Sequence, residues 1–369
     1  MKRQRKIVTQ GDYLELDECL GKYSTVLLVA GNTLSRLKIG SYFDAIEKRL
    51  KIKIVRFGEF NPNPLYESVV KGVELFKKEH CEAIIAVGGG SAIDVAKCIK
   101  LYSNMNSSKN YLEQVVVPND IELIAVPTTA GTGSEATRYA VIYYGGEKQS
   151  VSNYSCIPST VLFDASLLKT LPEYQRKVTM LDALCHAIES FWSINSNTES
   201  KMYSYDAIRM IIKNKDVYLA NEDIGNVAMM KAANIAGKAI NITQTTAGHA
   251  MSYKLTSLYG IAHGHAVALC VSKLFRYMVD NTEKCMDSRG GEYLNLIFIK
   301  IAEAMECDSV QAAVDRFDGI VSGLGLEVPV PRIEDYNILK NSVNPIRLKN
   351  NPVKLDMETI DYLYHQILE

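Results

Sequence analysis

The chain has 369 residues, of which 47% are hydrophobic, and its formal net charge is -1. This length usually divides into two domains, and the apolar content suffices for buried cores, so the composition does not indicate a disordered protein. The near-zero charge gives no overall attraction to nucleic acid or anionic membranes, and no apolar run could span a membrane, so we expect a small-molecule partner.

The basic start of the chain, residues 1–6, is not followed by the apolar stretch that a signal peptide needs. The eight cysteines are scattered without C-x-x-C pairs, and several lie in apolar or helical segments. We therefore expect reduced thiols, mostly acting as small core residues, in a cytoplasmic protein.

Short β-rich runs alternate with helical stretches in the first part of the chain, which favours a parallel sheet covered on both faces. Continuous apolar runs such as residues 83–87 are typical of strands buried on both sides. In chain order, we predict a strand at 25–30, a helix near 34–50, a strand at 52–57, a helix near 65–79, and strands at 83–87, 123–126 and 160–163, the last two bracketing a hairpin around Gly145 and Gly146.

After about residue 172, apolar residues recur with helical spacing and few strands are evident. Val178, Leu181, Leu184 and Ile188, for example, form an apolar stripe on a helix that follows Pro172. We therefore predict an α/β domain at 1–166 and a helical domain at 167–369.

A glycine run, Gly88-Gly89-Gly90-Ser91, follows a predicted buried strand and leads into a helix near 92–101. Glycines allow close backbone approach to a phosphate, and the positive end of the helix attracts the anion. The G-x-G-x-x-G spacing is absent, so this run is either another type of diphosphate loop or a tight turn. The polar segment 127–135 follows the next strand and is either a ligand contact or an ordinary loop.

Asp182 and His186 lie one turn apart on the same face of a strongly apolar helix, where burial is costly without a partner or a metal. His249 and His263 also have apolar neighbours. One Asp and three His can bind a divalent transition metal and leave a position open for a substrate oxygen. A simple Asp–His hydrogen bond and unrelated core histidines are the alternatives.

Taken together and in this order, these motifs resemble the iron-containing alcohol dehydrogenases of the dehydroquinate-synthase-like superfamily, from about Val26 to Val271. The resemblance implies an α/β N-terminal Rossmann-like nucleotide-binding domain plus an all-α C-terminal domain, with the active site in the cleft between them, in a homodimer. It implies a metal-dependent oxidoreductase that interconverts a small aldehyde and a primary alcohol with NADPH or NADH. Its metal, Fe²⁺ or Zn²⁺, would be bound by Asp182, His186, His249 and His263.

The resemblance also implies which residues bind the nucleotide. The positions that match are Gly89, Gly90, Ser91, Thr128, Thr129, Asn63, Thr137 and Lys148. Gly31 stands where many NAD-using relatives carry a carboxylate that binds the adenosine ribose. Losing that charge makes room for a 2′-phosphate, which favours NADPH, with NADH as the alternative.

Three further positions depart from familiar relatives. Tyr253 replaces a histidine linked to proton relay, so the candidates for that role are Tyr253 and His265. Arg138 and Lys254 occupy positions that are often uncharged, and they are either solvated surface residues or a clamp for an anionic substrate.

The segments 180–193 and 249–267 most resemble those of phosphonoacetaldehyde reductases. This predicts reduction of phosphonoacetaldehyde to 2-hydroxyethylphosphonate. The alternatives are a reductase of an uncharged aldehyde of the lactaldehyde or butyraldehyde type, a dehydroquinate-synthase-like lyase, and a non-catalytic nucleotide-binding protein.

Overall fold

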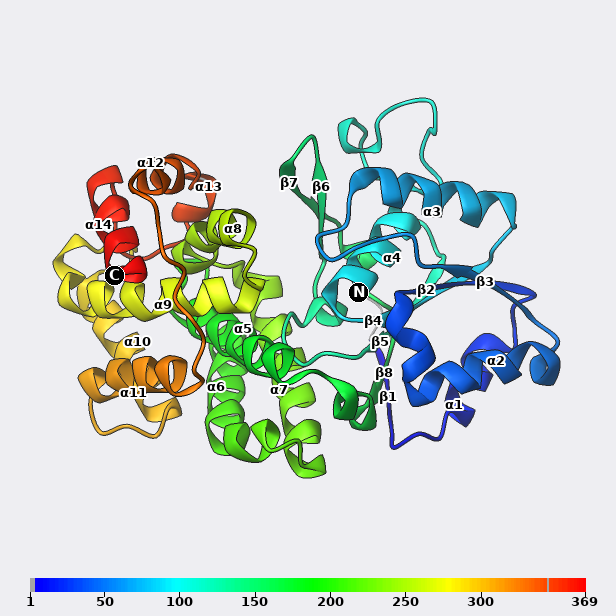
Figure 1. The fold of residues 1–369 in the computed structure, drawn as a ribbon, viewed down its shortest axis with the longest axis horizontal. Helices are drawn as coiled ribbons and strands as arrows, with labels where there is room; N and C mark the ends of the chain where they lie inside the picture. The colour runs from blue at the N-terminus through cyan, green and yellow to red at the C-terminus, as the bar shows by residue number, and fades with distance from the viewer. Residues whose placement is uncertain (1–3, 344) are drawn as a thin grey trace. The chain divides into compact units, whose positions relative to one another are not determined.

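The computed structural model describes residues 4–343 and 345–369, and the chain divides into two compact units. Unit 1 comprises Met1–Leu171 with Asn221–Met230, and unit 2 comprises Pro172–Ala220 with Lys231–Glu369. The large sheet belongs to unit 1, whereas unit 2 is built from helices (Figure 1). The predicted fold class, an α/β domain followed by a helical domain, is confirmed.

The sheet of unit 1 has six strands in the order β1-β8-β5-β4-β2-β3, and every pairing is parallel. Its strands are β1 (Arg5–Thr9), β2 (Thr25–Ala30), β3 (Lys53–Phe57), β4 (Ala83–Gly88), β5 (Glu122–Pro127) and β8 (Thr160–Asp164). β4 is buried along its whole length, as its continuous apolar run predicts.

Side chains that alternate along the strands form two hydrophobic cores, one on each face of the sheet. Ile84 of β4 packs with helices α3 (Tyr66–Lys78) and α4 (Gly90–Tyr102), whereas its neighbour Ile85 packs with α1 (Leu14–Leu20) and α2 (Lys38–Leu50). Figure 1 shows these helix pairs on opposite faces of the sheet. The carboxyl ends of β4 and β5 lie side by side, since Gly88 pairs with Pro127.

The predicted hairpin is present as β6 (Tyr139–Tyr144) and β7 (Glu147–Ser152), which pair antiparallel across Gly145 and Gly146. The short 3₁₀ helices of unit 1 are η1 (Asn32–Arg36), η2 (Tyr111–Glu113), η3 (Ser134–Ala136), η4 (Tyr154–Cys156) and η5 (Ala165–Thr170). The predicted helix at 34–50 is therefore two elements, η1 and α2, which are separated at Leu37.

Strand β1 was not expected from the sequence. Only Ile7 of this strand is buried, and Arg5 and Lys6 stand beside it, so the local pattern carries little apolar signal. The strand is defined instead by its pairing with β8, which is distant in the sequence.

Unit 2 is formed by the remaining helices, with α7 contributing its first turns to unit 1. These helices are α5 (Glu173–Trp192), α6 (Thr198–Leu219), α7 (Asp223–Thr243), α8 (Ala247–Tyr259), α9 (His263–Asp280), α10 (Gly291–Ala304), α11 (Val310–Gly323), α12 (Ile333–Asn341), α13 (Pro345–Leu348) and α14 (Met357–Leu368), with the 3₁₀ helix η6 (Thr282–Lys284). Within the described residues, no helix has the length and apolar content needed to cross a membrane.

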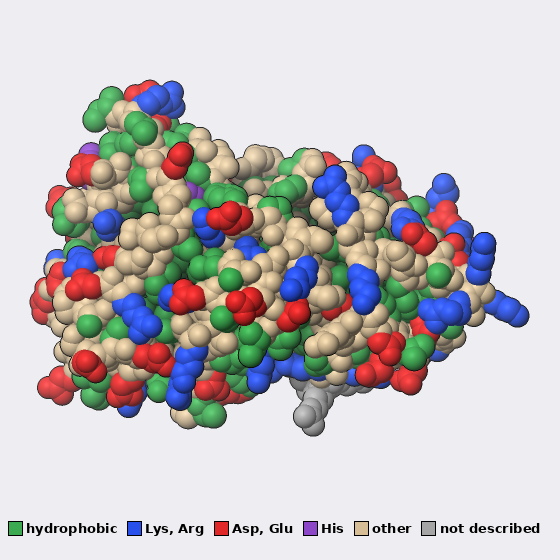
Figure 2. Space-filling model, turned by 60° about the horizontal axis from the view of Figure 1, so that its bottom comes forward, with side chains coloured by type: hydrophobic (Ala, Val, Ile, Leu, Met, Phe, Trp, Pro, Cys, Tyr) green, Lys and Arg blue, Asp and Glu red, His purple; other side chains and the backbone are tan. Residues whose placement is uncertain are grey.

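All eight cysteines lie in the described part of the chain and are free thiols, and six of them are buried, as expected for small core residues. On the face shown in Figure 2, acidic and basic side chains are interspersed, in keeping with the net charge of -1.

Candidate functional site

Helix α5 carries the first two residues of the candidate metal site. Asp182 and His186 are one turn apart and only 3% and 5% exposed. The Nε2 atom of His186 lies 3.9 Å from Oδ1 of Asp182. The helical spacing therefore places both groups on one buried face, as predicted.

Helices α8 and α9 bring two more histidines to this face. The His249 ring stacks on the His186 ring with centroids 4.5 Å apart, and the His263 ring meets His249 edge-on at 5.4 Å. Gly264 permits this approach of α9 to α5, because a Cβ atom there would lie 2.0 Å from the carbonyl oxygen of Val178. A side chain at this position would separate the two helices.

Three of the four predicted metal ligands form a group suited to one ion. Asp182, His249 and His263 each offer a ligand atom, and these atoms all lie within 4.8 Å of one another. His186 is outside this group but borders it through its contacts with Asp182 and His249. The hypothesis of a shared metal site requires that residues of α5, α8 and α9 lie close together, and these three do.

The polar atoms of this group fit a cation. Oδ1 of Asp182 and Nε2 of His249 are buried, lie 3.7 Å apart, and have no hydrogen-bond partner among the described residues. Buried polar atoms without partners are costly, and a carboxylate and two imidazoles are suitable donors for iron or zinc. A divalent cation between these atoms would satisfy both of them.

The electrostatics of the group also favour positive charge at its centre. Burial by itself raises the pKa of Asp182, but the attraction of His186, His249 and His263 outweighs it and holds that pKa well below its usual range. Burial likewise lowers the pKa of His249, but Glu189 and Asp182 outweigh it and raise that pKa.

Glu189 is a functional candidate that the sequence analysis missed. It is fully buried on α5, and it contacts His249 Nδ1 through a short hydrogen bond. Its position seven residues after Asp182, two helical turns further along the same face, was a usable signal. A histidine flanked by Asp182 and Glu189 resembles the carboxylate–histidine–metal arrangement common in metalloproteins.

The predicted nucleotide-binding loop lies where β4 meets α4. Gly89 precedes the helix and Gly90 begins it, so the free amides of the first turn lie at this loop. Gly90 packs against Thr132 so closely that a Cβ atom would lie 2.9 Å from Cγ2 of Thr132. The loop that contains Thr128 and Thr129 therefore lies directly against the glycine run, as predicted.

The three other residues predicted to contact the nucleotide, Thr137, Asn63 and Lys148, lie outside these two loops. The hydroxyl of Thr137 is buried and accepts a hydrogen bond from the ammonium of Lys97 at 3.1 Å, so its hydrogen-bond partner lies within the protein. Asn63 is exposed, and Lys148 is partly buried on β7. Their roles stay predictions.

Gly31 lines a cavity of about 340 Å³ at the end of β2. Asn32, Ser35, Asp44 and Arg56 also line it, and the guanidinium of Arg56 is 2.7 Å from the Asp44 carboxylate. A Cβ atom on Gly31 would meet nothing within 4 Å. The site predicted to receive the adenosine ribose is therefore open.

The residues predicted to contact the substrate fall in both units. Tyr253 stacks on the His263 ring with centroids 5.7 Å apart, which brings it to the metal group, and Lys254 follows it on α8. His265 lies 3.3 Å from the Tyr174 hydroxyl. Arg138 of unit 1 packs against the rings of Tyr139 and Tyr154, each 4.7 Å from its guanidinium.

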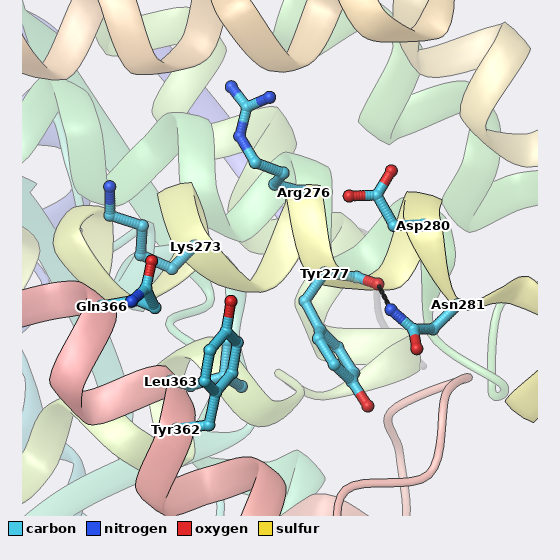
Figure 3. A pocket seen from close by; sticks show the side chains of 8 residues that line it. All are labelled: Lys273, Arg276, Tyr277, Asp280, Asn281, Tyr362, Leu363 and Gln366. Carbon is cyan, nitrogen blue, oxygen red and sulfur yellow. Dashed lines mark hydrogen bonds between the residues drawn. The ribbon is translucent and has the colours of Figure 1, made fainter.

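Another cavity, of about 300 Å³, lies on unit 2 between α9 and α14. Figure 3 shows Lys273, Arg276 and Tyr277 from α9, with Tyr362 and Gln366 from α14. None of the residues predicted for the metal or substrate site lines this cavity. It is a surface feature separate from the candidate metal group.

A parallel α/β unit with a glycine-rich loop at the start of a helix, joined in one chain to a helical unit with a buried Asp–His group, is the combination found in metal- and nucleotide-dependent dehydrogenases. The chain belongs to the iron-containing alcohol dehydrogenase family. The family model "Iron-containing alcohol dehydrogenase" matches residues 4–165, and "Fe-containing alcohol dehydrogenase family, C-terminal" matches residues 177–368. Members are aldehyde/alcohol oxidoreductases that use a divalent metal and NAD(H).

Similar proteins include several alcohol dehydrogenases and aldehyde reductases. The chain is 28% identical over 312 residues to the phosphonoacetaldehyde reductase of Streptomyces viridochromogenes, covering 80% of this chain and 79% of that protein. It is 33% identical over 274 residues to the 1,3-propanediol dehydrogenase of Citrobacter freundii, covering 71% and 70%. The structure of sulfoacetaldehyde reductase from Bifidobacterium kashiwanohense in complex with NAD+ has a TM-score of 0.87 at 24% identity, covering 100% of this chain and 98% of that chain.

Proposed function

We propose that this protein reduces a small anionic aldehyde, of the phosphonoacetaldehyde type, to the primary alcohol, with Asp182, His186, His249 and His263 binding the metal. The observation that carries the proposal is the pair of buried atoms Asp182 Oδ1 and His249 Nε2, which lie 3.7 Å apart and have no hydrogen-bond partner in the part of the chain that the structure describes. A cation there would satisfy both atoms.

When bound, the metal supplies Lewis-acid stabilisation of the charge that develops on the carbonyl oxygen, and the nicotinamide supplies the hydride. The residues of the chain bind and orient these groups. The amides around Gly89 and Gly90 hold the diphosphate. The Tyr253 hydroxyl, whose ring stacks on His263, holds the proton that the product oxygen requires.

The position of Lys254 supports the proposal that the substrate is anionic. It lies one residue beyond Tyr253 and five beyond His249 on α8, and no hydrogen bond or ion pair engages its ammonium in residues 4–343 or 345–369. An ammonium that is not engaged by other groups among the described residues can bind a phosphonate. The similarity to a phosphonoacetaldehyde reductase points to the same substrate class.

Steady-state assays with phosphonoacetaldehyde, lactaldehyde and butyraldehyde test the substrate. We expect the highest kcat/KM for phosphonoacetaldehyde, and we expect Lys254→Met to lower it by about 10- to 100-fold with little effect on butyraldehyde. The matched control is Lys300→Met, which removes an exposed lysine paired with Glu303. Equal kcat/KM values for all three aldehydes would contradict an anionic substrate, and the absence of net NAD(P)H consumption would favour a lyase.

The open cavity at Gly31 supports NADPH as the preferred cofactor, because glycine at this position carries no carboxylate to repel a 2′-phosphate, and the Asp44 carboxylate that also lines the cavity is paired with Arg56. Gly31→Asp introduces that charge into open space. We expect it to shift the ratio of kcat/KM values toward NADH by about 10- to 100-fold. An unchanged ratio would contradict the assignment of this cavity to the ribose.

A further inference from the structure

The carboxylate of Glu189 is held by three hydrogen bonds to one of its oxygens. Oε1 accepts from the Thr246 hydroxyl at 2.7 Å, from the Thr246 amide at 3.3 Å and from the His249 amide at 3.2 Å. The two amides belong to the start of α8, where N–H groups have no partner within the helix. The orientation of this carboxylate is therefore determined by the beginning of the helix that carries His249.

A second contact determines which way the Thr246 hydroxyl donates its hydrogen bond. The indole Nε1 of Trp192 donates to the Thr246 hydroxyl oxygen at 2.9 Å, and an indole nitrogen can only donate. The Thr246 hydrogen is thus available for Glu189 Oε1. Trp192, Thr246 and Glu189 form a buried chain in which each donor has one acceptor.

The second oxygen of Glu189 decides which nitrogen of His249 carries a proton. Oε2 contacts Nδ1 of His249, and an ionised carboxylate can only accept, so Nδ1 donates. The lone pair of a neutral His249 is then on Nε2, the nitrogen that lies 3.7 Å from Asp182 Oδ1. Nε2 is therefore the atom offered to a cation.

We propose that Glu189 is a positioning residue that fixes the ring orientation and tautomer of His249 for metal binding. This inference rests on the metal assignment made under the proposed function. Such partners of ligating histidines generally strengthen metal binding, because they orient the ring and increase the basicity of the ligating nitrogen.

Glu189→Gln gives an expectation specific to this geometry. Three donors face the position of Oε1, so the amide oxygen of Gln would take that place and its NH₂ group would face Nδ1 of His249. Nδ1 must then accept, and the proton moves to Nε2, where it blocks metal binding. The substitution preserves size and shape but selects the wrong tautomer.

The test measures binding of Co²⁺ alone to chelator-treated full-length protein, by its visible absorption and by competition with a chelator. We expect Glu189→Gln to weaken Co²⁺ binding by about 10- to 100-fold and to alter the Co²⁺ spectrum. The matched control is Ser190→Ala, a buried neighbour on the same helix whose hydroxyl accepts a hydrogen bond from Thr243 rather than contacting the metal group. Ser190→Ala should bind Co²⁺ as the wild type does.

A fold check by circular dichroism accompanies each variant. If Glu189→Gln does not fold, Thr246→Val replaces it, because this variant removes one donor to Glu189 and should weaken Co²⁺ binding to a smaller but measurable extent. Wild-type affinity and spectrum in the folded variant would overturn the role of Glu189 alone. A wild-type protein that binds no Co²⁺ would instead overturn the metal assignment itself.

Discussion

Each unit contains a buried polar cluster, and the two clusters differ in whether they are complete. In unit 1, the ammonium of fully buried Lys97 lies 2.8 Å from the Thr137 carbonyl, 2.7 Å from the Tyr139 carbonyl and 3.0 Å from the Ser134 hydroxyl. Its three hydrogens therefore all have acceptors. In unit 2, Asp182 Oδ1 and His249 Nε2 face each other without a hydrogen-bond partner among the described residues.

The difference indicates different roles. A cluster whose charged groups all have partners within the protein has a structural role. Lys97 joins α4 to Tyr139, just after the polar loop at residues 127–135. Asp94, also on α4, accepts a hydrogen bond from the Val141 amide 2.9 Å away. A cluster with inward-facing atoms that lack partners needs a further component. Chelators should therefore affect only the second cluster, and substitutions in either cluster test this distinction.

The largest effect is expected from Asp182→Ala, or from His263→Ala, which removes a ligand from the group in unit 2. We expect loss of metal retention together with loss of turnover by about a thousandfold. Metal content by mass spectrometry and NAD(P)H oxidation would be measured on the same preparation. Retained activity in a metal-free preparation would contradict the mechanism.

Lys97→Met tests the cluster in unit 1. It leaves the acceptors at Ser134, Thr137 and Tyr139 without their donor, which should lower the free energy of unfolding by about 3 to 5 kcal/mol. Urea titration measures the change, and chelation should not alter it. Lys71→Met, which breaks only an exposed pair with Glu59, should cost less than about 1 kcal/mol. An equal cost for both variants would show that the buried cluster is not structural.

Metal removal compares the clusters directly. A ligand present at about a thousand times its dissociation constant stabilises the folded state by about 4 kcal/mol, so chelation should lower the thermal midpoint of the wild-type protein. Chelation should not lower the thermal midpoint of Asp182→Ala, whereas it should lower that of Lys97→Met as much as that of the wild type. A chelator effect in Asp182→Ala would mean that the metal binds elsewhere.

The smallest effect concerns His265, which lies two residues after the predicted ligand His263 on α9. Burial lowers the pKa of His265, so the folded state favours the neutral ring. Its contribution is present above the pKa of the unfolded state, about 6.5, and is lost as the pH falls below that value. The free energy of unfolding should fall between pH 7 and pH 5, and we expect this fall to be smaller in His265→Leu than in the wild type by less than about 1 kcal/mol. Urea titration in the presence of a chelator measures it. His365→Gln, near the C-terminus, is the control, and an acid loss identical to that of the wild type would contradict the prediction.

The metal group was predictable in part. The four-residue spacing of Asp182 and His186 identifies one buried helical face, and the same logic extends to Glu189, two turns from Asp182. The group of three that includes Asp182, His249 and His263 but leaves His186 at its border was not predictable, because it depends on how α8 and α9 pack on α5. Likewise, Thr137 matched a nucleotide contact in sequence, but its hydroxyl is buried against Lys97.

The sequence by itself determined the alternation of strands and helices from β2 to β8, the parallel sheet and the position of the glycine-rich loop, because local periodicity and turn residues encode these features within a few neighbouring positions. Tertiary structure alone decided that β1 joins the sheet edge through β8, that Lys97 is enclosed by acceptors, and that Glu189 faces Nδ1 of His249. The physical reason is that these contacts join residues far apart in the chain, whose pairing depends on burial and close packing of whole elements rather than on local pattern.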